Sequence, residues 1–136
     1  MHRQEKVNAM SRDYAGLANE ISVNLDDEVF CTRMIRRAVQ LLALLTDEND
    51  IAAFHARPAS TESAQWDALI AGVAAHTWSL SGHNEPLDWT KPLNPLPEWW
   101  EPAGSPQRWR FWNMLQTPPS LQARKVIFPR QWLEAV

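Results

Sequence analysis

Residues 26–45, DDEVFCTRMIRRAVQLLALL, decide the fold class of this chain. Apolar side chains recur through them at intervals of three and four residues, which is the period of an amphipathic α-helix. Asp26, Asp27 and Glu28 come first and supply the capping oxygens and negative charge that a helix N-terminus favours. The stretch therefore predicts a long central helix whose apolar face consists of Phe30, Met34, Ala38, Leu41, Leu42 and Leu45, broadened by Val29, Ile35 and Val39.

A second amphipathic pattern lies on the N-terminal side of this helix. Apolar residues spaced by three and four predict a helix over residues 4–23, and their stripe is as narrow as a two-per-heptad seam. Such a seam suits contact with one other helix. We therefore expect it either to dock on a helix of its own chain or to form a homodimer through residues 4–25. The stripe consists of Val7, Met10, Tyr14, Leu17, Ile21 and Leu25.

Two further helices are predicted after the central one. Thr46 and Asp47 supply the N-cap of a short helix that ends near Pro58. Ser60 or Thr61 supplies the N-cap of a longer helix, and Gly82 takes the place of the glycine that follows a helix C-terminus. The longer helix has a broad apolar face of Trp66, Leu69, Ile70, Val73, Thr77, Trp78 and Leu80.

The second half of the chain has a different composition, because seven of the eight Trp and nine of the ten Pro lie between Trp78 and Trp132. Residues 84–104 show neither helical nor strand periodicity. A disordered linker is normally poor in aromatic residues, so we expect these residues to form an ordered loop that wraps over the helical core.

The residues after this loop carry shorter signals. The Ser-Pro pair at residues 105–106 predicts the N-terminus of a helix, and the Thr-Pro pair at residues 117–118 predicts a shorter one. Residues 126–128 have strand-like composition and are expected to be extended, and Pro129 begins a final helical turn. The first of these helices carries a stripe of Trp109, Trp112 and Leu115.

Together these patterns predict one all-α domain over residues 1–136, a compact bundle of five or six helices with the Trp/Pro-rich loop around it. Residues 1–65 supply the N-terminal helices, and residues 66–136 form the Trp/Pro-rich half. We expect the core to include Leu17, Ile21, Phe30, Met34, Ala38, Leu41, Leu42, Leu45, Trp66, Ile70, Val73 and Trp112.

Composition narrows the class of protein. The single cysteine, Cys31, cannot form an internal disulfide and is expected to be a buried structural thiol. The first thirteen residues lack the apolar stretch of a secretory signal, and the longest apolar run, residues 41–45, is too short to span a membrane. We therefore expect a cytoplasmic protein. No P-loop, dinucleotide fingerprint or catalytic serine or zinc motif is present, so we expect neither enzyme activity nor a cofactor.

Two other classes of function remain as alternatives. His76 and His83 flank a predicted helix end with Glu85 close behind, which would suit an enzyme pocket or a metal site, although zinc needs three or four converging ligands. A DNA- or RNA-binding regulator would use cations against phosphates. The net charge of −3 disfavours that role, and only residues 105–136 are basic. Its cations would be Arg33, Arg36 and Arg37, or Arg108, Arg110, Arg124 and Lys125.

Residues 66–136 carry an ordered series of segments, namely WDALIAGVAAHTWSLSGH, PLDWTKPLNPLPEWWEP, SPQRWRFWNML and TPPSLQARKVIFPRQWLEAV. This series resembles a family of small bacterial proteins that are often encoded beside nucleotidyltransferase-like partners in toxin–antitoxin pairs. Lys125 departs from the pattern, because a Gly would be more usual there. The matching positions are Trp89, Trp99, Trp100, Thr117, Pro118, Arg124 and Phe128.

The resemblance implies an antitoxin-like protein that binds a toxin enzyme and restrains it by steric contact, without catalysis. Trp89, Trp99 and Trp100 lie outside the predicted helices, so we expect them to anchor the partner. The basic rim around these anchors would consist of Arg108, Arg110 and Arg124.

Overall fold

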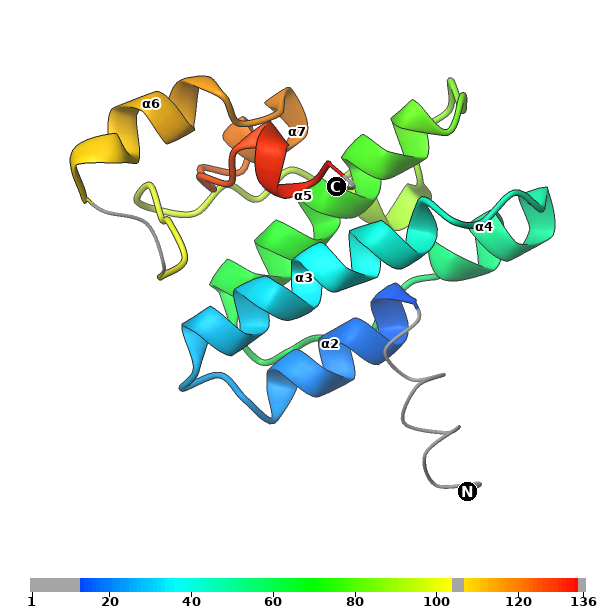
Figure 1. Ribbon diagram of the computed structural model, residues 1–136, viewed down its shortest axis with the longest axis horizontal. Coiled ribbons are helices and arrows are strands. Elements are labelled where there is room, and N and C mark those ends of the chain that lie inside the picture. Colours follow the sequence, from blue (N-terminus) through cyan, green and yellow to red (C-terminus); the bar gives the residue numbers. More distant parts are fainter. Residues whose placement is uncertain (1–12, 104–106, 135–136) are drawn as a thin grey trace.

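The computed structural model describes residues 13–103 and 107–134, and within them the chain forms α-helices and 3-10 turns but no β-strand (Figure 1). The prediction of an all-α protein with five or six helices is confirmed for this part of the chain. Its α-helices are α2 (Tyr14–Ser22), α3 (Glu28–Leu42), α4 (Glu48–Phe54), α5 (Ala64–Leu80), α6 (Arg110–Leu115) and α7 (Pro119–Gln122). Its 3-10 turns are η1 (Asp88–Thr90), η2 (Gln107–Trp109) and η3 (Arg130–Trp132).

Helices α2 to α5 each begin at a polar N-cap side chain that accepts a backbone hydrogen bond from the first turn. The prediction of Ser60 or Thr61 as the cap of α5 is wrong, since Ser63 takes that position. Both hydroxyls donate instead to the carboxylate of Asp67, at 2.6 Å and 2.7 Å. At the other end of α5, Gly82 has a φ of +91°, which suits its predicted place after the helix end.

Helix α5 lies at the centre of the described core. Helix α2 packs on both α3 and α5, whereas α7 and η1 contact other parts of the α5 surface (Figure 1). Seven of the predicted core residues are buried, which confirms that part of the prediction. They are Leu17, Ile21, Ala38, Leu42, Trp66, Ile70 and Val73.

The buried face of α3 overlaps the predicted one, because Ala38 and Leu42 are buried together with Ile35 and Val39, whereas Leu41 is only partly buried. Cys31, Ile35 and Val39 point into the core, whereas Phe30 and Met34 are only partly buried at its border. Apolar residues occupy more than half of the circumference of this helix. Periodicity alone therefore cannot decide which of two neighbouring stripes lies innermost.

The α2 part of the proposed dimer seam is buried within its own chain, and Leu25, after α2, is partly buried. Tyr14, Leu17 and Ile21 of α2 are at most 1 % exposed, because α3 and α5 cover them. A second copy cannot reach these side chains, so the seam is intramolecular over α2. Residues 4–12, which the prediction also included, lie outside the described residues.

The Trp/Pro-rich segment supplies two side chains to the core. Leu96 is 6 % exposed and Trp100 is 9 % exposed. The Trp100 ring packs edge-on against that of Trp66, with the ring centroids 5.0 Å apart. Residues 91–103, which follow η1 and contain no helix or strand, thus contribute apolar burial directly to the helical core.

Trp100 is also the backbone partner of the stretch that was predicted to be extended. It forms an isolated parallel bridge with Val126. The Trp100 N–H donates to the Lys125 carbonyl at 3.0 Å, and the Ile127 N–H donates to the Trp100 carbonyl at 2.8 Å. The single bridge satisfies backbone groups that burial would otherwise leave unpaired.

Candidate protein-binding surface

The turn η2 and helix α6 direct their large apolar side chains outward. Trp109, Phe111, Trp112 and Leu115 are 48, 69, 54 and 56 % exposed, and we call these four residues the aromatic surface. The prediction that Trp112 belongs to the core is therefore wrong. Helix α6 lies at the edge of the molecule, away from α2 and α4 (Figure 1).

Polar side chains occupy the inner side of α6. Asn113 is 5 % exposed, and its Nδ2 donates to Glu101 Oε2 at 2.8 Å. Arg110 is half-buried, and its Nη2 donates to the Trp99 carbonyl at 3.0 Å. A helix on a protein surface normally buries its apolar side. In α6 the polarity is reversed: the polar side chains of Arg110 and Asn113 face inward and the aromatic ones face outward. This is why the prediction of Trp112 as a core residue was wrong.

A cavity of about 330 Å³ lies between the aromatic surface and η3. Trp109, Trp112 and Trp132 supply its aromatic walls. The Trp132 carbonyl accepts a hydrogen bond from Arg36 Nε at 3.3 Å, which places Arg36 of α3 near this cavity. Arg108 lies over the Trp109 ring, with its Cζ 5.6 Å from the ring centroid.

The arginines near the aromatic surface are not paired with carboxylates of the described residues. Within residues 13–103 and 107–134, the contacts between a basic side chain and a carboxylate are those of His83 with Glu48 and of Lys91 with Asp88. The positive charge around α6 is therefore available to a partner, because nothing in the described chain neutralises it directly.

The three predicted Trp anchors lie in different environments. Trp89 is half-buried, and its Nε1 donates to the His55 carbonyl at 2.9 Å. Trp99 is half-buried beside α6, to which its carbonyl is bonded. Trp100 is buried in the core, so it is not accessible to a partner. Their position outside helices did not imply exposure, because the Trp/Pro-rich segment itself packs on the core.

The three predicted rim arginines also separate. Arg108 is exposed and Arg110 is half-buried, and both belong to the elements that carry the aromatic surface. Arg124 is only 4 % exposed. Its guanidinium donates to the carbonyls of Ser120 and Thr90, each at 2.6 Å. Arg124 therefore cannot act as a surface rim residue.

The structure does not bring the predicted histidine site together. His83 stacks on Trp78 with the ring centroids 3.5 Å apart, and its Nε2 contacts Glu48. Glu85 contributes its backbone carbonyl, which accepts a hydrogen bond from Trp78 Nε1 at 2.9 Å. His76 lines a separate apolar cavity. Within the described residues, no group of three or more His, Cys, Asp or Glu could hold a metal ion.

A buried polar chain that the sequence analysis missed joins α2, α4 and α5. Thr77 Oγ1 lies 2.8 Å from both Tyr14 Oη and His55 Nε2, and His55 Nδ1 lies 2.8 Å from the Ile51 carbonyl. A carbonyl can only accept, so Nδ1 carries a proton. Burial lowers the pKa of His55 and favours the neutral ring, so Nε2 accepts from Thr77. The single hydroxyl proton of Thr77 also faces the Ala74 carbonyl, 3.2 Å from Oγ1.

Tyr14 completes the order of this chain. Burial raises the pKa of its hydroxyl, which therefore stays protonated and donates to Thr77. Tyr14 and His55 are at most 1 % exposed. These hydrogen-bonded side chains therefore link three helices and are not accessible to a substrate. A signal was present in the sequence, because Thr77 is a polar residue within a predicted apolar face.

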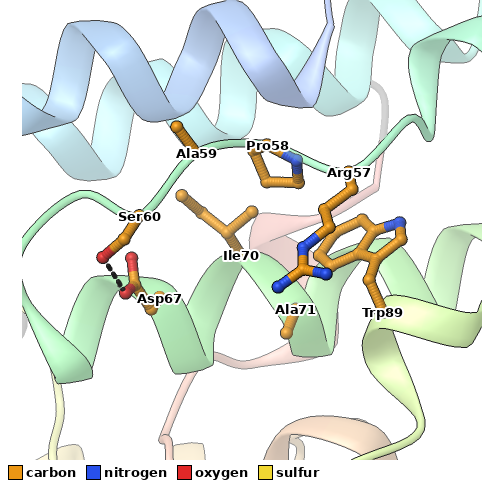
Figure 2. A pocket seen from close by; sticks show the side chains of 8 residues that line it. All are labelled: Arg57, Pro58, Ala59, Ser60, Asp67, Ile70, Ala71 and Trp89. Carbon is orange, nitrogen blue, oxygen red and sulfur yellow. Dashed lines mark hydrogen bonds between the residues drawn. The ribbon is translucent and has the colours of Figure 1, made fainter.

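Figure 2 shows a smaller cavity, of about 220 Å³, between residues 57–60 and α5. The side chains of Arg57 and Trp89 lie together at one end of it. Asp67 and Ser60 lie at the other end, joined by their hydrogen bond. This carboxylate is engaged by the loop before α5, so the cavity offers no free acid for proton transfer.

No protein-family model, curated protein or solved structure matches this chain. Across residues 13–103 and 107–134, no helix has the length and apolar character to cross a bilayer. The structure itself is therefore the basis for classifying this protein. It is an all-α protein whose helix α6 exposes its aromatic side chains and buries a polar one, beside arginines that form no ion pair within the described residues.

Proposed function

We propose that this protein is a non-catalytic protein-binding module whose aromatic surface docks on an acidic surface of a partner protein. The reversed polarity of α6 carries the proposal, since Asn113 is buried while Phe111 and Trp112 are more than half exposed. Apolar patches of this kind on a monomer mark surfaces that binding later covers. Tryptophan is enriched among the residues that dominate binding energy, because it offers a large contact area with few rotatable bonds.

Charge supports an acidic contact surface on the partner. Residues 105–136 contain five Lys or Arg against one Glu. Arg108 and Arg130 are exposed, and neither forms an ion pair within the described residues. Opposite charge on the partner would steer the encounter and fix its orientation, while the rings supply most of the affinity.

The partner that we propose is a toxin enzyme of the nucleotidyltransferase-like kind, which the bound protein neutralises by blocking access to its surface. The exposed aromatic surface supports the claim that this protein binds another protein. The identity of the partner rests on the resemblance of residues 66–136 to antitoxin-like proteins.

Co-expression with the product of the neighbouring gene tests the proposal. We expect a complex that survives size-exclusion chromatography. The double variant Phe111→Ala/Trp112→Ala should weaken it about 30-fold or more, because truncating residues that dominate an interface costs about 2 kcal/mol or more.

Leu44→Ala is the matched control, because Leu44 is a large apolar side chain that is 76 % exposed away from α6. It should change the affinity by less than about twofold. The failure of the two proteins to associate, or equal effects of the two variants, would contradict the proposal.

Salt dependence separates this function from a nucleic-acid-binding regulator. Duplex DNA held by six phosphate contacts would lose about 10³-fold in affinity between roughly 50 and 200 mM salt, whereas a complex anchored by rings changes far less. Oligonucleotide binding with that dependence, weakened by Arg108→Gln, would favour the regulator over the protein-binding module.

A further inference from the structure

Arg124 is a buried cation without a counter-charge in the described chain. Its side chain is 4 % exposed, and burial lowers its pKa. Two of its five N–H groups donate to the carbonyls of Ser120 and Thr90, and the other three have no partner among the described residues. Within residues 13–103 and 107–134, no carboxylate forms an ion pair with Arg124. Burying a charge in this way is costly unless an opposite charge accompanies it.

Arg124 lines a cavity of about 450 Å³ between α5 and the Pro-rich residues 92–97. The α5 wall consists mainly of alanines, and Leu96 adds another apolar side chain. Asn94 contributes a neutral polar group to the same cavity. The volume is in the range of small-molecule sites, which are mostly apolar with a few polar groups that fix orientation.

Asp67 also lines this cavity but does not neutralise Arg124. Its Oδ1 accepts hydrogen bonds from the Thr61 N–H at 2.8 Å and from Thr61 Oγ1 at 2.7 Å. Its Oδ2 accepts from Ser60 Oγ at 2.6 Å. The carboxylate is thus committed to the loop before α5. Its negative charge still disfavours a dianion in the cavity more than a monoanion.

We propose that this cavity binds a small aliphatic monocarboxylate. The carboxylate accepts hydrogen bonds from the free N–H groups of Arg124, whose planar fork matches a carboxylate. The hydrocarbon part packs against Ala68, Ala71 and Leu96. One buried cation beside Asp67 favours a single negative charge, so inorganic phosphate binds poorly. The site is independent of the aromatic surface, since it is built from α5, residues 92–97 and Arg124.

Thermal unfolding at constant ionic strength tests this site in the full-length protein. Butyrate should raise the Tm by a few degrees with saturation, relative to chloride, because a ligand that binds only the folded state stabilises it. Phosphate should have little effect. In a ¹⁵N NMR titration, the Arg124 Nε–H resonance should shift with the same midpoint. A linear, unsaturated response to every anion would overturn the proposal.

Asn94→Asp provides a sharper test that leaves Arg124 and the core in place, because Asn94 is exposed in the Pro-rich segment. The new carboxylate supplies the missing counter-charge from within the cavity. We expect a higher Tm in chloride and at least a tenfold weaker butyrate response. Asn84→Asp is the control, because Asn84 is also exposed but lies outside the lining of this cavity. Equal responses of the two variants would overturn the proposal.

Discussion

Tyr14, Thr77 and His55 form a buried hydrogen-bonded chain, in which the Thr77 proton lies between two acceptors, His55 Nε2 and the Ala74 carbonyl. The Ile51 carbonyl fixes the tautomer of His55, so Nε2 of the neutral imidazole is an acceptor that faces Thr77. Such a chain stabilises a core only while all of its members are satisfied. Protonation of the imidazole would leave the Ala74 carbonyl as the remaining acceptor for the Thr77 hydroxyl and would place a charge in an apolar environment.

Stability should therefore fall as the pH falls. Burial lowers the pKa of His55 and of His76 in the folded state, so the unfolded chain binds protons first, and protonation favours unfolding below about pH 6.5. We expect the free energy of unfolding to decrease between about pH 7.5 and pH 5. Urea denaturation at both values measures it.

His55→Gln isolates one of these two contributions. It should be less stable than the wild type at the higher pH, because it breaks the polar chain, but it should show a shallower loss on acidification. An unchanged pH dependence in this variant would mean that His55 does not titrate as its burial requires.

Lys125 occupies a backbone conformation that suits glycine. Its φ is +62°, in the left-handed region that residues with a side chain adopt at a cost. We expect Lys125→Gly to keep or raise the free energy of unfolding, by up to about 1 kcal/mol, and Lys125→Val to lower it by more than about 1 kcal/mol. Lys91 has a φ of −65°, so Lys91→Gly should give no gain. Chemical denaturation of the three variants checks this, and a gain in both glycine variants would contradict it.

Close packing of helices depends on one glycine where α5 meets α7. A Cβ at Gly72 would lie 2.5 Å from Leu121 Cδ2 and 3.3 Å from its Cα. The Gly72 carbonyl also accepts a hydrogen bond from Ser120 Oγ at 2.8 Å. The two helices are thus held at a separation that leaves no room for a side chain.

Gly72→Ala should destabilise the protein even though alanine is the better helix former. The propensity gain is about 1 kcal/mol, whereas overpacking a core costs about 1–3 kcal/mol, so we expect a net loss. In a double-mutant cycle, Leu121→Val should remove part of the penalty, because it shortens the side chain that the new methyl group meets. Additive effects of the two substitutions would contradict this explanation.

The sequence predicted which residues form helices better than it predicted which side of each helix is buried. Helix existence follows from periodicity and caps, and it was predicted correctly for α3, α4 and α5. The inward side of α6 depends instead on Trp99 and Glu101, which are distant in sequence from its periodic stripe. No local pattern contains that information. The Arg124 cavity could not be predicted for the same reason, because its walls come from segments that are distant in the sequence and meet only in the folded protein.

Across the whole molecule, the hydrophobic core and the aromatic surface use different tryptophans. Trp66 is 2 % exposed and packs on Trp100, whereas Trp112 is 54 % exposed. The two sets can therefore be altered separately, and the binding and stability of this protein should be experimentally separable.

We expect Trp66→Ala to cost about 3–5 kcal/mol of unfolding free energy and Trp112→Ala less than about 1 kcal/mol. The difference arises because only the first substitution leaves a cavity. Urea denaturation monitored by circular dichroism measures both values. A large loss for Trp112→Ala would mean that this ring is packed within the molecule, and the aromatic surface would then not be a free docking site.

The pairing of Trp100 with Val126 shows that residues near the C-terminal end belong to the same core as the first helices. Contacts between distant residues, such as Arg36 with the Trp132 carbonyl, form only after long loops close, and loop closure slows folding. Helices α2 to α5 can assemble early, but Val126, Phe128 and Leu133 complete the same core. A growing polypeptide must therefore extend through Leu133 before its core can close, and until then the part of α5 that α7 covers stays exposed.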